Sequence, residues 1–523
     1  MNRRSIRLCY LALPMLIVAA CVFQPALANA QMTSQGVNCS DIQKYHIDMQ
    51  DNMRAGLIMI ECGLAEGGHP SAAANLPPSP PNIRVSNRSC SSSSSCTKSE
   101  SNVWASTKNK GQTIVVNYND HNGNNYSGTS YSTNGGKTFT EISPPPFSSG
   151  HGGENFGDPI VVFNSKLGMF FAGDLIGGGN CGSQGIGLWT SPDGKTWTVG
   201  SCPHIGAADD RESFWVDNEP TSGKYGRMYV SWNDFNNNAA LSLVYSDDGT
   251  TWSAPVILAN GSTFIRDVQV TGTPAGTKRF EGANSTVFVA GMDEGGGGCA
   301  TRQNLMYKSL DGGVTWTSTT LGPRFASICG VNCGYFTGPP PIWRHMGWGE
   351  PAVGPNGVVH YDYAGAGAKN GDPGDVYYVR SKDNGNTWST PIKLNTDKDS
   401  QFAEQWMPSL SADKAGHVTA SWYDRRKATT SCVNVTDPGC KYERVGRQSK
   451  TNGATFLPAI TISTALIPQP AQDDPGVQSC YAGDYDYNTA LAGSAYVTWT
   501  DGRRSVTGVN VQDVDFAKVP EPK

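Results

Sequence analysis

Short segments in which β-branched, aromatic and small polar residues alternate recur along most of the chain, and many end near an aspartate. Examples are RMYVSWND at 227–234, HVTASWYD at 417–424 and SAYVTWTD at 494–501. Segments of this kind, bounded by turn residues, are typical of β-strands. The 523 residues include 61 Gly and 32 Pro, and only 16% are charged, which suits a loop-rich β-protein better than a helical one. We therefore expect an all-β fold.

A short turn phrase of the form S-x-D-x-G-x-T-W/F follows many of these segments. Asp and Asn side chains accept hydrogen bonds from backbone amides in turns, and Gly supplies a positive φ. The aromatic residue then begins the next strand, where it can pack on the layer below. Each phrase predicts a hairpin loop, with Trp197, Trp252, Trp316 and Trp388 largely buried. The six copies begin at Ser132, Ser191, Ser246, Ser309, Ser381 and Ser449.

This phrase is that of the Asp-box, and from about residue 82 to residue 519 the chain resembles the sialidase-like BNR-repeat β-propellers. The resemblance implies a ring of four-stranded blades around a central channel. It implies less about function, because Asp-boxes lie at the periphery of the blades, away from the active face.

A second repeat, upstream of the turn phrases, sets the number of blades. Its units begin near residues 100, 154, 211, 266, 346, 404 and 481. The last unit has no turn phrase and offers only three strands, and NIRVSN at 82–87 can supply the fourth. Closure of the ring by both ends of this region would leave no free sheet edge. We predict a propeller of seven four-stranded blades over 82–519, with six blades as the alternative.

Residues 1–30 have the pattern of a signal peptide. Three arginines precede an apolar run at 8–23, and an A-x-A cleavage motif ends at Ala30. We expect the mature chain to start at Gln31 and to be secreted or periplasmic. In the alternative, a lipobox ends at Cys21, and that residue carries the lipid. No other segment is apolar enough to span a bilayer.

Residues 31–81 form a separate N-terminal region in the sequence. The stretch between Cys39 and Gly63 predicts a short amphipathic helix, and PPSPP at 77–81 predicts a stiff linker before the ring.

Cysteines indicate disulfides rather than a metal site. Twelve of the 14 Cys remain after residue 30, and an even number in an exported chain is typical of disulfide pairing. No CxxC motif occurs and the eight His do not cluster with Cys, so we expect no metal and no cofactor. The expected pairs are Cys39–Cys62, Cys90–Cys96, Cys181–Cys202, Cys329–Cys333, Cys432–Cys440 and Cys299–Cys480.

Charge excludes some classes of partner. The net charge is −5 and no basic run follows the first residues, so neither nucleic acid nor an anionic membrane surface is indicated. We expect a monomer.

The starts of the inner strands of a propeller gather on one face, which is the default binding site. Three arginines and several carboxylates on one funnel favour an anionic ligand such as an acidic glycan. In the alternative, the carboxylates only pair with the arginines. The residues at these starts are Glu154, Arg211, Glu212, Arg266, Asp267, Arg344, His345, Glu404 and Tyr481.

The resemblance to sialidases implies roles for these residues. That family clamps the substrate carboxylate with three Arg, whose planar guanidinium groups bind carboxylates bidentately. It uses a Tyr nucleophile made basic by a Glu, and an Asp as acid/base. Carried over, Tyr481 is the nucleophile, Glu212 its partner, and Asp158 or Asp120 the acid. The substrate-binding set is Arg211, Arg266, Arg344, Glu404 and His345.

The chain also departs from the sialidase pattern. Arg84 lies in NIRVS, where the family has Arg-Ile-Pro, and a seventh blade differs from the six-bladed sialidase ring. The interval from Arg344 to Tyr481 is long, which leaves Tyr361 and Tyr363 as alternative nucleophiles.

The sequence thus predicts an exported glycan-active protein, an exo-α-sialidase or another hydrolase acting on acidic sugars. A uronate polysaccharide lyase is one alternative, with His345 or His151 as base. A non-catalytic propeller that binds carbohydrate or protein at the cell envelope is the other, because the same fold serves both purposes.

Overall fold

A computed structural model gives the fold. The parts of the chain that it describes are 31–69, 82–86, 90, 92–122, 125–142, 151, 153–260, 264–277, 282–296, 300–328, 347–367, 372–398, 403–429, 439–470, 472–479 and 481–523.

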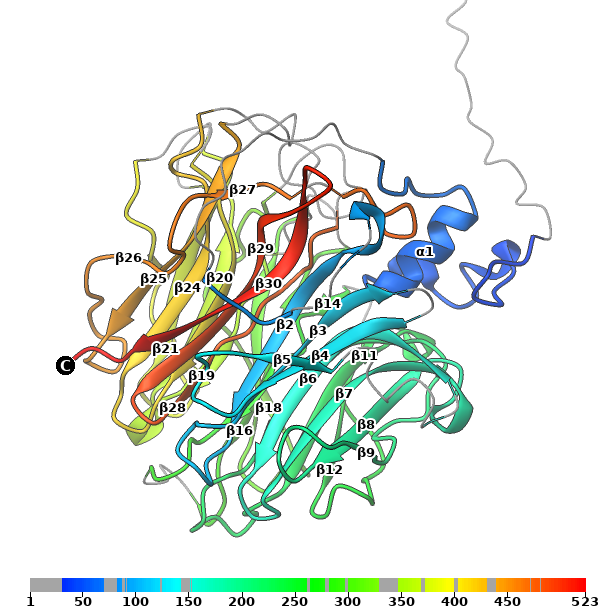
Figure 1. Cartoon of the computed structure of the whole chain (residues 1–523). Helices are drawn as coiled ribbons and strands as arrows, with labels where there is room; N and C mark the ends of the chain where they lie inside the picture. Colours follow the sequence, from blue (N-terminus) through cyan, green and yellow to red (C-terminus); the bar gives the residue numbers. More distant parts are fainter. Residues whose placement is uncertain are drawn as a thin grey trace, which may run out of the picture.

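Seven antiparallel sheets form the seven blades of a β-propeller (Figure 1). Blade 1 holds β2 (Lys98–Ala105), β3 (Ile114–Asn122), β4 (Asn125–Ser132) and β5 (Thr140–Ile142). Blade 2 holds β6 (Gly153–Asn164), β7 (Met169–Gly178), β8 (Gly185–Ser191) and β9 (Thr198–Val199). Blade 3 holds β10 (Asp209–Val216), β11 (Met228–Asp234), β12 (Ala240–Ser246) and β13 (Val256–Ala259).

The innermost strand of blade 4 is split into β14 (Ile265–Arg266) and β15 (Val270–Gly272), which both pair with β16 (Val287–Asp293), followed by β17 (Gln303–Ser309) and β18 (Thr317–Thr320). Blade 5 holds β19 (Pro351–Val353), β20 (Val359–Gly365), β21 (Asp375–Ser381) and β22 (Ile392–Lys393). Blade 6 holds β23 (Gln405–Ala412), β24 (Val418–Asp424), β25 (Lys441–Ser449) and β26 (Ile460–Thr461), with β27 (Ile467–Pro468) also on β25. Blade 7 holds β28 (Thr489–Leu491), β29 (Ser494–Val506), β30 (Val509–Pro520) and β1 (Ile83–Arg84).

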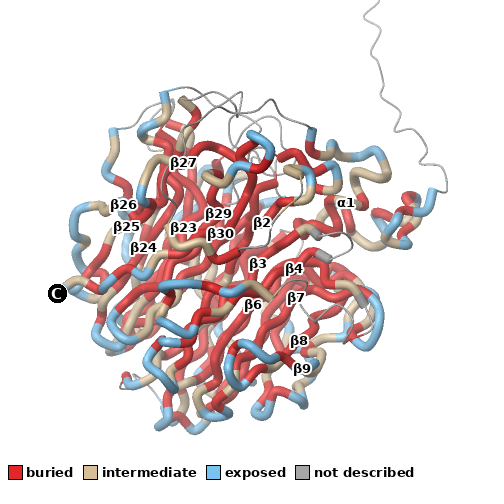
Figure 2. The backbone as a smooth tube through the Cα atoms, in the orientation of Figure 1, coloured by how far each residue is buried: buried red, intermediate tan, exposed pale blue. Residues whose placement is uncertain are grey.

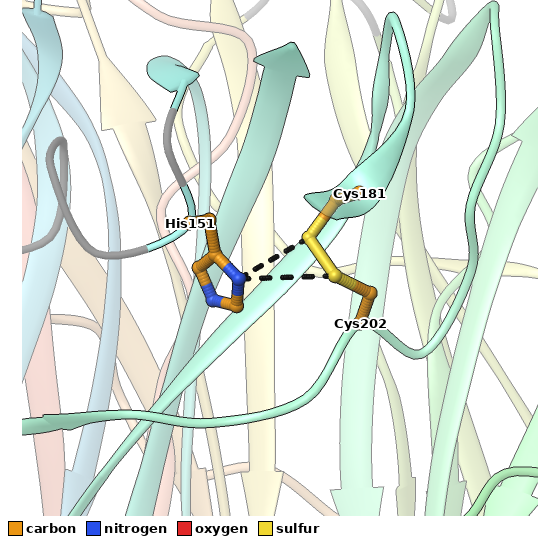
Figure 3. A group of neighbouring side chains, drawn as sticks. All are labelled: His151, Cys181 and Cys202. Carbon is orange, nitrogen blue, oxygen red and sulfur yellow. Dashed lines mark hydrogen bonds between the residues drawn. A yellow bond between two sulfur atoms is a disulfide. The ribbon is translucent and has the colours of Figure 1, made fainter. Parts of the chain in front are cut away.

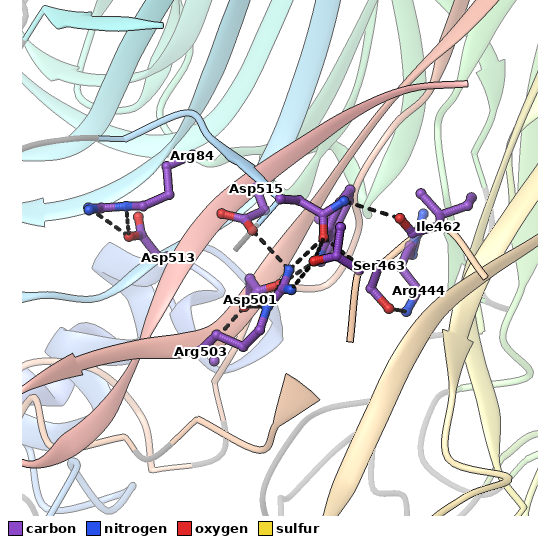
Figure 4. A network of polar contacts seen from close by, with 12 residues as sticks. Arg84, Arg444, Ile462, Ser463, Asp501, Arg503, Asp513 and Asp515 are labelled. Carbon is purple, nitrogen blue, oxygen red and sulfur yellow. Dashed lines mark hydrogen bonds and ion pairs between the residues drawn. The ribbon is translucent and has the colours of Figure 1, made fainter. Parts of the chain in front are cut away.

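The propeller implied by the resemblance is therefore confirmed, with seven blades rather than six. The ring closes as the sequence predicts: β1 pairs antiparallel with β30, with Ile83 opposite Phe516 and Arg84 opposite Asp515. An ion pair of 3.0 Å between Arg84 and Asp513 reinforces this junction (Figure 4). The first strand of the ring thus covers the edge that the last strand would leave open.

Hydrophobic cores lie between the blades. Trp406, Trp422 and Trp499, from blades 6 and 7, are fully buried in one cluster. Figure 2 shows buried backbone through the blades and exposed backbone mainly at the turns. Burial of aromatic rings between neighbouring sheets holds the ring together, since each blade alone would leave both of its faces exposed.

The six turn phrases are hairpin loops of one design. In the fifth, Ser381 Oγ accepts the Gly385 N–H at 2.8 Å and Asp383 Oδ1 accepts the Thr387 N–H at 2.8 Å. Gly385 has φ +79°, which only glycine adopts at little cost. The other five copies have the same Ser–Gly bond at 2.8 to 3.0 Å.

Burial of the turn tryptophans differs from expectation. Trp197 is 8% exposed, whereas Trp252, Trp316 and Trp388 are half-buried. The indole N–H of Trp197 donates to the Gly194 carbonyl at 3.2 Å. Trp197 is thus largely buried as expected, while the other three are buried less deeply and pack against the edges of hydrophobic clusters.

Three of the expected disulfides are present: Cys39–Cys62, Cys90–Cys96 and Cys181–Cys202. Cys440 is also disulfide-bonded. The other three expected pairs are Cys432–Cys440, Cys299–Cys480 and Cys329–Cys333. Each includes at least one cysteine outside the described residues, namely Cys299, Cys329, Cys333, Cys432 or Cys480. Disulfides fit a protein of an oxidising compartment.

The N-terminal region carries the one α-helix of the described residues, α1 (Met53–Glu61), which packs beside β6 (Figure 1). The Asn52 side chain caps it by accepting the Ala55 N–H at 2.9 Å. Helices in the described part of the chain are all too short or too polar to cross a bilayer. The short 3-10 helices are Cys39–Asp41, Ile47–Met49, Ser93–Ser95, Gly179–Cys181, Phe235–Asn237 and Pro355–Gly357.

Candidate functional site

The inner strands of five blades share an irregularity near their starts. At these positions the backbone pairing breaks and a residue other than glycine takes a positive φ. For residues other than Gly, Asn and Asp such a conformation is strained, and strain of this kind concentrates at functional sites. The residues are Glu100 (φ +44°), Asp158 (φ +60°), Arg211 (φ +57°), Asp267 (φ +61°) and Met407 (φ +46°).

Carboxylates in the inner strands, or just before them, bind the next blade. Asp158 of blade 2 accepts the Arg211 N–H of blade 3 at 2.9 Å. Glu350, before blade 5, accepts the Leu410 N–H of blade 6 at 2.9 Å, and Asp486, before blade 7, accepts the Ser101 N–H of blade 1 at 3.0 Å. We call this set the inner acid ring: Glu100, Asp158, Asp267, Glu350 and Asp486.

Arg211 is held in an aromatic cage. Its guanidinium carbon lies 3.9 Å from the ring centre of Tyr485 and 4.6 Å from that of Trp348. It donates to the Tyr487 hydroxyl and lies 3.7 Å from Asp267 Oδ1. Arg211 is 2% exposed, so a ligand would reach this guanidinium only through its aromatic neighbours.

Arg266 is fully buried between two carboxylates. Its Nη2 lies 2.8 Å from Asp210 Oδ2 and forms an ion pair with Asp51. Its Nη1 donates to the Met49 carbonyl at 2.8 Å. Two of the three expected clamp arginines are thus paired with carboxylates, and one of those carboxylates comes from the N-terminal region.

Two of the predicted catalytic carboxyls, Asp158 and Glu212, lie near each other, and Asp158 bonds to Arg211. Burial, and then the neighbouring Asp210, raise the pKa of Asp158 to about 7. Burial, and then Asp158, raise the pKa of Glu212 well above its ordinary value. Neither carboxylate oxygen of Glu212 has a hydrogen-bond partner from another residue. A buried carboxyl without a partner is costly, and such groups are candidates for chemistry.

Tyr481 connects to this group through Asn119. The Asn119 amide donates to Tyr481 Oη at 2.8 Å and to Glu100 Oε2 at 2.6 Å, while its Oδ1 accepts the Asp158 N–H at 3.1 Å. Tyr481 is therefore joined to Glu100 by an amide rather than bonded to Glu212. The alternative nucleophile Tyr361 donates to Asp267 Oδ2 at 2.7 Å.

The other predicted residues are placed differently. Glu404 lies in blade 6 and pairs with Arg425. Arg344 and His345 lie outside the described residues, so the third arginine of the expected clamp is not located. Asp120, the alternative acid, is fully buried in β3.

A cavity of about 600 Å³ occupies the central channel. Its deep end is lined by Ser213, Gln269, Glu350 and Tyr487, and its mouth by Lys110 and Lys414, at the ends of the inner strands. Tyr487 thus touches both the channel and Arg211. Glu350 is half-buried, and burial raises its pKa well above the ordinary value.

Trp104 projects into this channel. It lines the cavity and packs at the edge of hydrophobic clusters that belong to blades 1 to 4. Its ring is half-buried, and Trp215 lines the same space. An aromatic face with hydroxyl and amide groups around it is the usual lining of a small-molecule site.

His151, a base considered for the lyase alternative, lies against a disulfide (Figure 3). Its Nδ1 is 3.4 Å from Cys181 Sγ and 3.8 Å from Cys202 Sγ, and its Nε2–H donates to the Leu188 carbonyl at 2.9 Å. Within the described ranges this is the one cluster with metal-ligand geometry, but both sulfurs are in the disulfide. The three side chains are therefore not free to bind a metal.

Sequence reasoning missed the residues that surround the predicted ones. Trp348, Tyr485 and Tyr487 form the cage of Arg211, and only the tyrosines had a signal, the run CYAGDYDY at 480–487. The roles of Glu350 and Asp51 could not be predicted from the sequence, because they depend on contacts across more than 50 residues of chain.

No family model and no curated protein matches the chain. Solved structures with a similar fold include a protein of unknown function from Dyadobacter fermentans, with 12% identity and a TM-score of 0.42, covering 84% of this chain and 98% of that one. An ulvan lyase of polysaccharide lyase family PL25 has 12% identity and a TM-score of 0.43, with 82% and 95% covered. A Hadza microbial sialidase has 15% identity and a TM-score of 0.37, with 81% and 66% covered, so this chain spans just under two thirds of that protein. At these levels the likenesses carry no argument about function.

Proposed function

We propose that the chain is an exported hydrolase acting on acidic sugars, with its reaction centre at Asp158, Arg211, Glu212 and Tyr481. The observation that carries the proposal is the pair of neighbouring carboxyls with raised pKa values, Asp158 and Glu212, of which Asp158 has a strained backbone and bonds to Arg211. Perturbed carboxyls beside a charged partner are characteristic of acid/base sites.

Each residue has a role that its surroundings support. Asp158, with a pKa of about 7, holds the proton that the leaving oxygen needs when the glycosidic bond breaks. Arg211 and Arg266, the two located arginines of the expected clamp, would bind the sugar carboxylate. Tyr481 Oη, which accepts the Asn119 amide N–H, would attack the anomeric carbon, and water would then release the sugar. Glu212, which has no hydrogen bond to Tyr481 in the structure, would take up the tyrosine proton after a side-chain movement that brings the two together, since a carboxyl with a raised pKa is the stronger base once ionised.

The test is hydrolysis of a 4-methylumbelliferyl α-sialoside and a 4-methylumbelliferyl β-glucuronide. We expect wild type to release fluorophore from one of them, and Asp158→Asn and Tyr481→Phe to lose about 10²- to 10⁴-fold in rate. Asp217→Asn is the matched control, because Asp217 is a buried carboxyl with a raised pKa at the far end of β10. Equal losses in the control and the site variants would contradict the assigned roles.

A second candidate function is carbohydrate binding without catalysis, and the channel is the observation that favours it. The half-buried ring of Trp104 and the half-buried Glu350 line a cavity of about 600 Å³, within the range of about 300–1,000 Å³ of ligand sites. The charges at its lining, two lysines and two carboxylates, balance, which suits an uncharged sugar. Tryptophan fluorescence titration with neutral oligosaccharides, comparing wild type with Trp104→Phe, tests this function separately.

A further inference from the structure

Residues 49–54 of the N-terminal region lie directly over the proposed reaction centre. The Asp51 N–H donates to Asp210 Oδ2 at 3.2 Å, and Asn52 Nδ2 donates to Asp210 Oδ1 at 2.7 Å. Arg54 Nη1 donates to Gln184 Oε1 at 3.0 Å, in blade 2. The segment therefore bonds to the start of β10 in blade 3 and to the residue before β8 in blade 2, on the same face as Asp158 and Arg211.

Asp51 supplies a carboxylate to Arg266. The guanidinium is fully buried, and its pKa is raised by Asp51 and Asp210 although burial opposes the rise. Asp210 belongs to the neighbouring blade, whereas Asp51 reaches Arg266 from outside the ring. A sugar carboxylate binding to Arg266 would have to take the place of the Asp51 side chain.

The same segment packs on the hydrophobic cluster that contains the proposed nucleophile. Met53 is 2% exposed and belongs to the hydrophobic cluster that contains Tyr481, Tyr126 and Phe156. The Arg54 guanidinium carbon lies 4.1 Å from the ring centre of Phe156. Removal of this segment would therefore expose the side chains beside Tyr481.

Residues 31–69, which contain this segment, are built as a unit of their own. The Cys39–Cys62 disulfide ties its two ends together. It also has a separate small core, formed by Val37, Ile42, Ile47, Ala55 and Ile58. Near the end of this unit, the Gly68 N–H donates to the Asp474 and Val477 carbonyls at 3.0 and 2.9 Å. These bonds fasten residues 31–69 to the rim of the ring.

We propose that residues 31–69 are an internal occupant of the site, in which Asp51 holds the anion position at Arg266 and Met53 packs on the cluster that contains Tyr481. An acidic sugar then binds at Arg266 only when this segment is displaced. The proposal rests on the proposed function for its ligand, but the occupancy itself can be measured without any substrate.

The experiment uses the full chain with a specific protease site inserted within 70–81, between the segment and β1. After cleavage, gel filtration in 0.5 M NaCl separates the 31–69 piece from the ring. Phenylglyoxal then labels accessible arginines, and peptide mass spectrometry measures the rate at Arg266. Arg444, which is fully buried in blade 6, reports any unfolding of the ring.

We expect Arg266 in the separated ring to react at least 10-fold faster than in the uncleaved chain, with Arg444 still protected. In the uncleaved chain, Asp51→Asn should raise the rate at Arg266 several-fold, and Asp48→Asn should leave it unchanged. Asp48 is the matched control because it is exposed in the same segment.

Retention of the piece by the ring together with an unchanged rate at Arg266 would overturn the inference, as would simultaneous exposure of Arg444. Hydrolysis by the uncleaved chain at the rate of the separated ring would also overturn it, while leaving the proposed function intact. A reactive Arg266 in a separated ring that hydrolyses neither fluorogenic glycoside would support the internal occupant and contradict the proposed function.

Discussion

Buried carboxyls are the distinctive residues of this protein, and most of them have a structural task. Asp158, Glu350 and Asp486 each accept a backbone N–H from the following blade. Such bonds satisfy amides that the bulged inner strands leave unpaired. Glu212 has no comparable bond, which is why the catalytic proposal gives it a chemical role rather than a structural one.

Asp362 allows a test of these carboxyls by pH. Burial raises its pKa to about 8, while Oδ1 accepts the Glu350 N–H at 3.0 Å. Between its ordinary pKa of 3.8 and about 8, the folded protein binds more protons at this group than the unfolded chain does. Its stabilising contribution is therefore present at low pH and is lost as the pH rises through about 8.

We expect the free energy of unfolding of wild type to fall from pH 6 to pH 8, with about 2 kcal/mol of the fall due to this group. Asp362→Asn keeps an oxygen for the Glu350 N–H and should remove that part of the fall. Urea unfolding at both pH values measures it, and identical pH dependence in the two proteins would contradict the raised pKa.

At the scale of the element, the turn phrases and the strands they join could be predicted from the sequence. Their hydrogen bonds are local, within four residues, so the pattern Ser–Asp–Gly–Thr is sufficient to specify them. The depth of the following tryptophan is not local. Trp197 packs in a cluster with Phe163, Phe170 and Trp189, and the sequence gives no measure of such contacts.

Replacing a deeply buried turn tryptophan should lower the free energy of unfolding more than replacing a half-buried one. We expect Trp197→Ala to lower the free energy of unfolding by about 3–5 kcal/mol, the range for a buried aromatic. Trp388→Ala should lower it by roughly half as much, because its ring is half-buried. Guanidinium unfolding of both variants provides the comparison, and equal losses would show that the observed difference in exposure has no energetic consequence.

At the scale of the whole molecule, the number of blades and their closure followed from the repeat that lacks a turn phrase. The set of residues that surrounds the site could not be predicted in this way. Arg266 contacts Asp51, 215 positions away in the chain, and the positive φ values of the inner strands leave no mark in the sequence. Arg344 and His345 were chosen because they stand at the expected start of an inner strand, and that position alone does not establish that residues share a site.

Closure of the ring predicts the effect of truncation. A chain that starts at residue 90 lacks β1 and exposes the edge of β30, so we expect it to aggregate or to melt at least 10 °C lower. A chain that starts at residue 82 keeps β1 and the Arg84–Asp513 ion pair and should keep the fold. Circular dichroism melts of both compare them, and equal melting temperatures would contradict a stabilising role for β1.

The central claim, that Asp158 is the proton donor of an acidic-sugar hydrolase, is tested most directly by the pH dependence of kcat/KM. Because burial raises the pKa of Asp158 to about 7, the rate on the susceptible fluorogenic glycoside should fall as the pH rises above about 7. Asp158→Asn should lose this fall together with about 10²- to 10⁴-fold of the rate. The same alkaline fall and the same rate in Asp158→Asn, or no hydrolysis by wild type with or without residues 31–69, would contradict it.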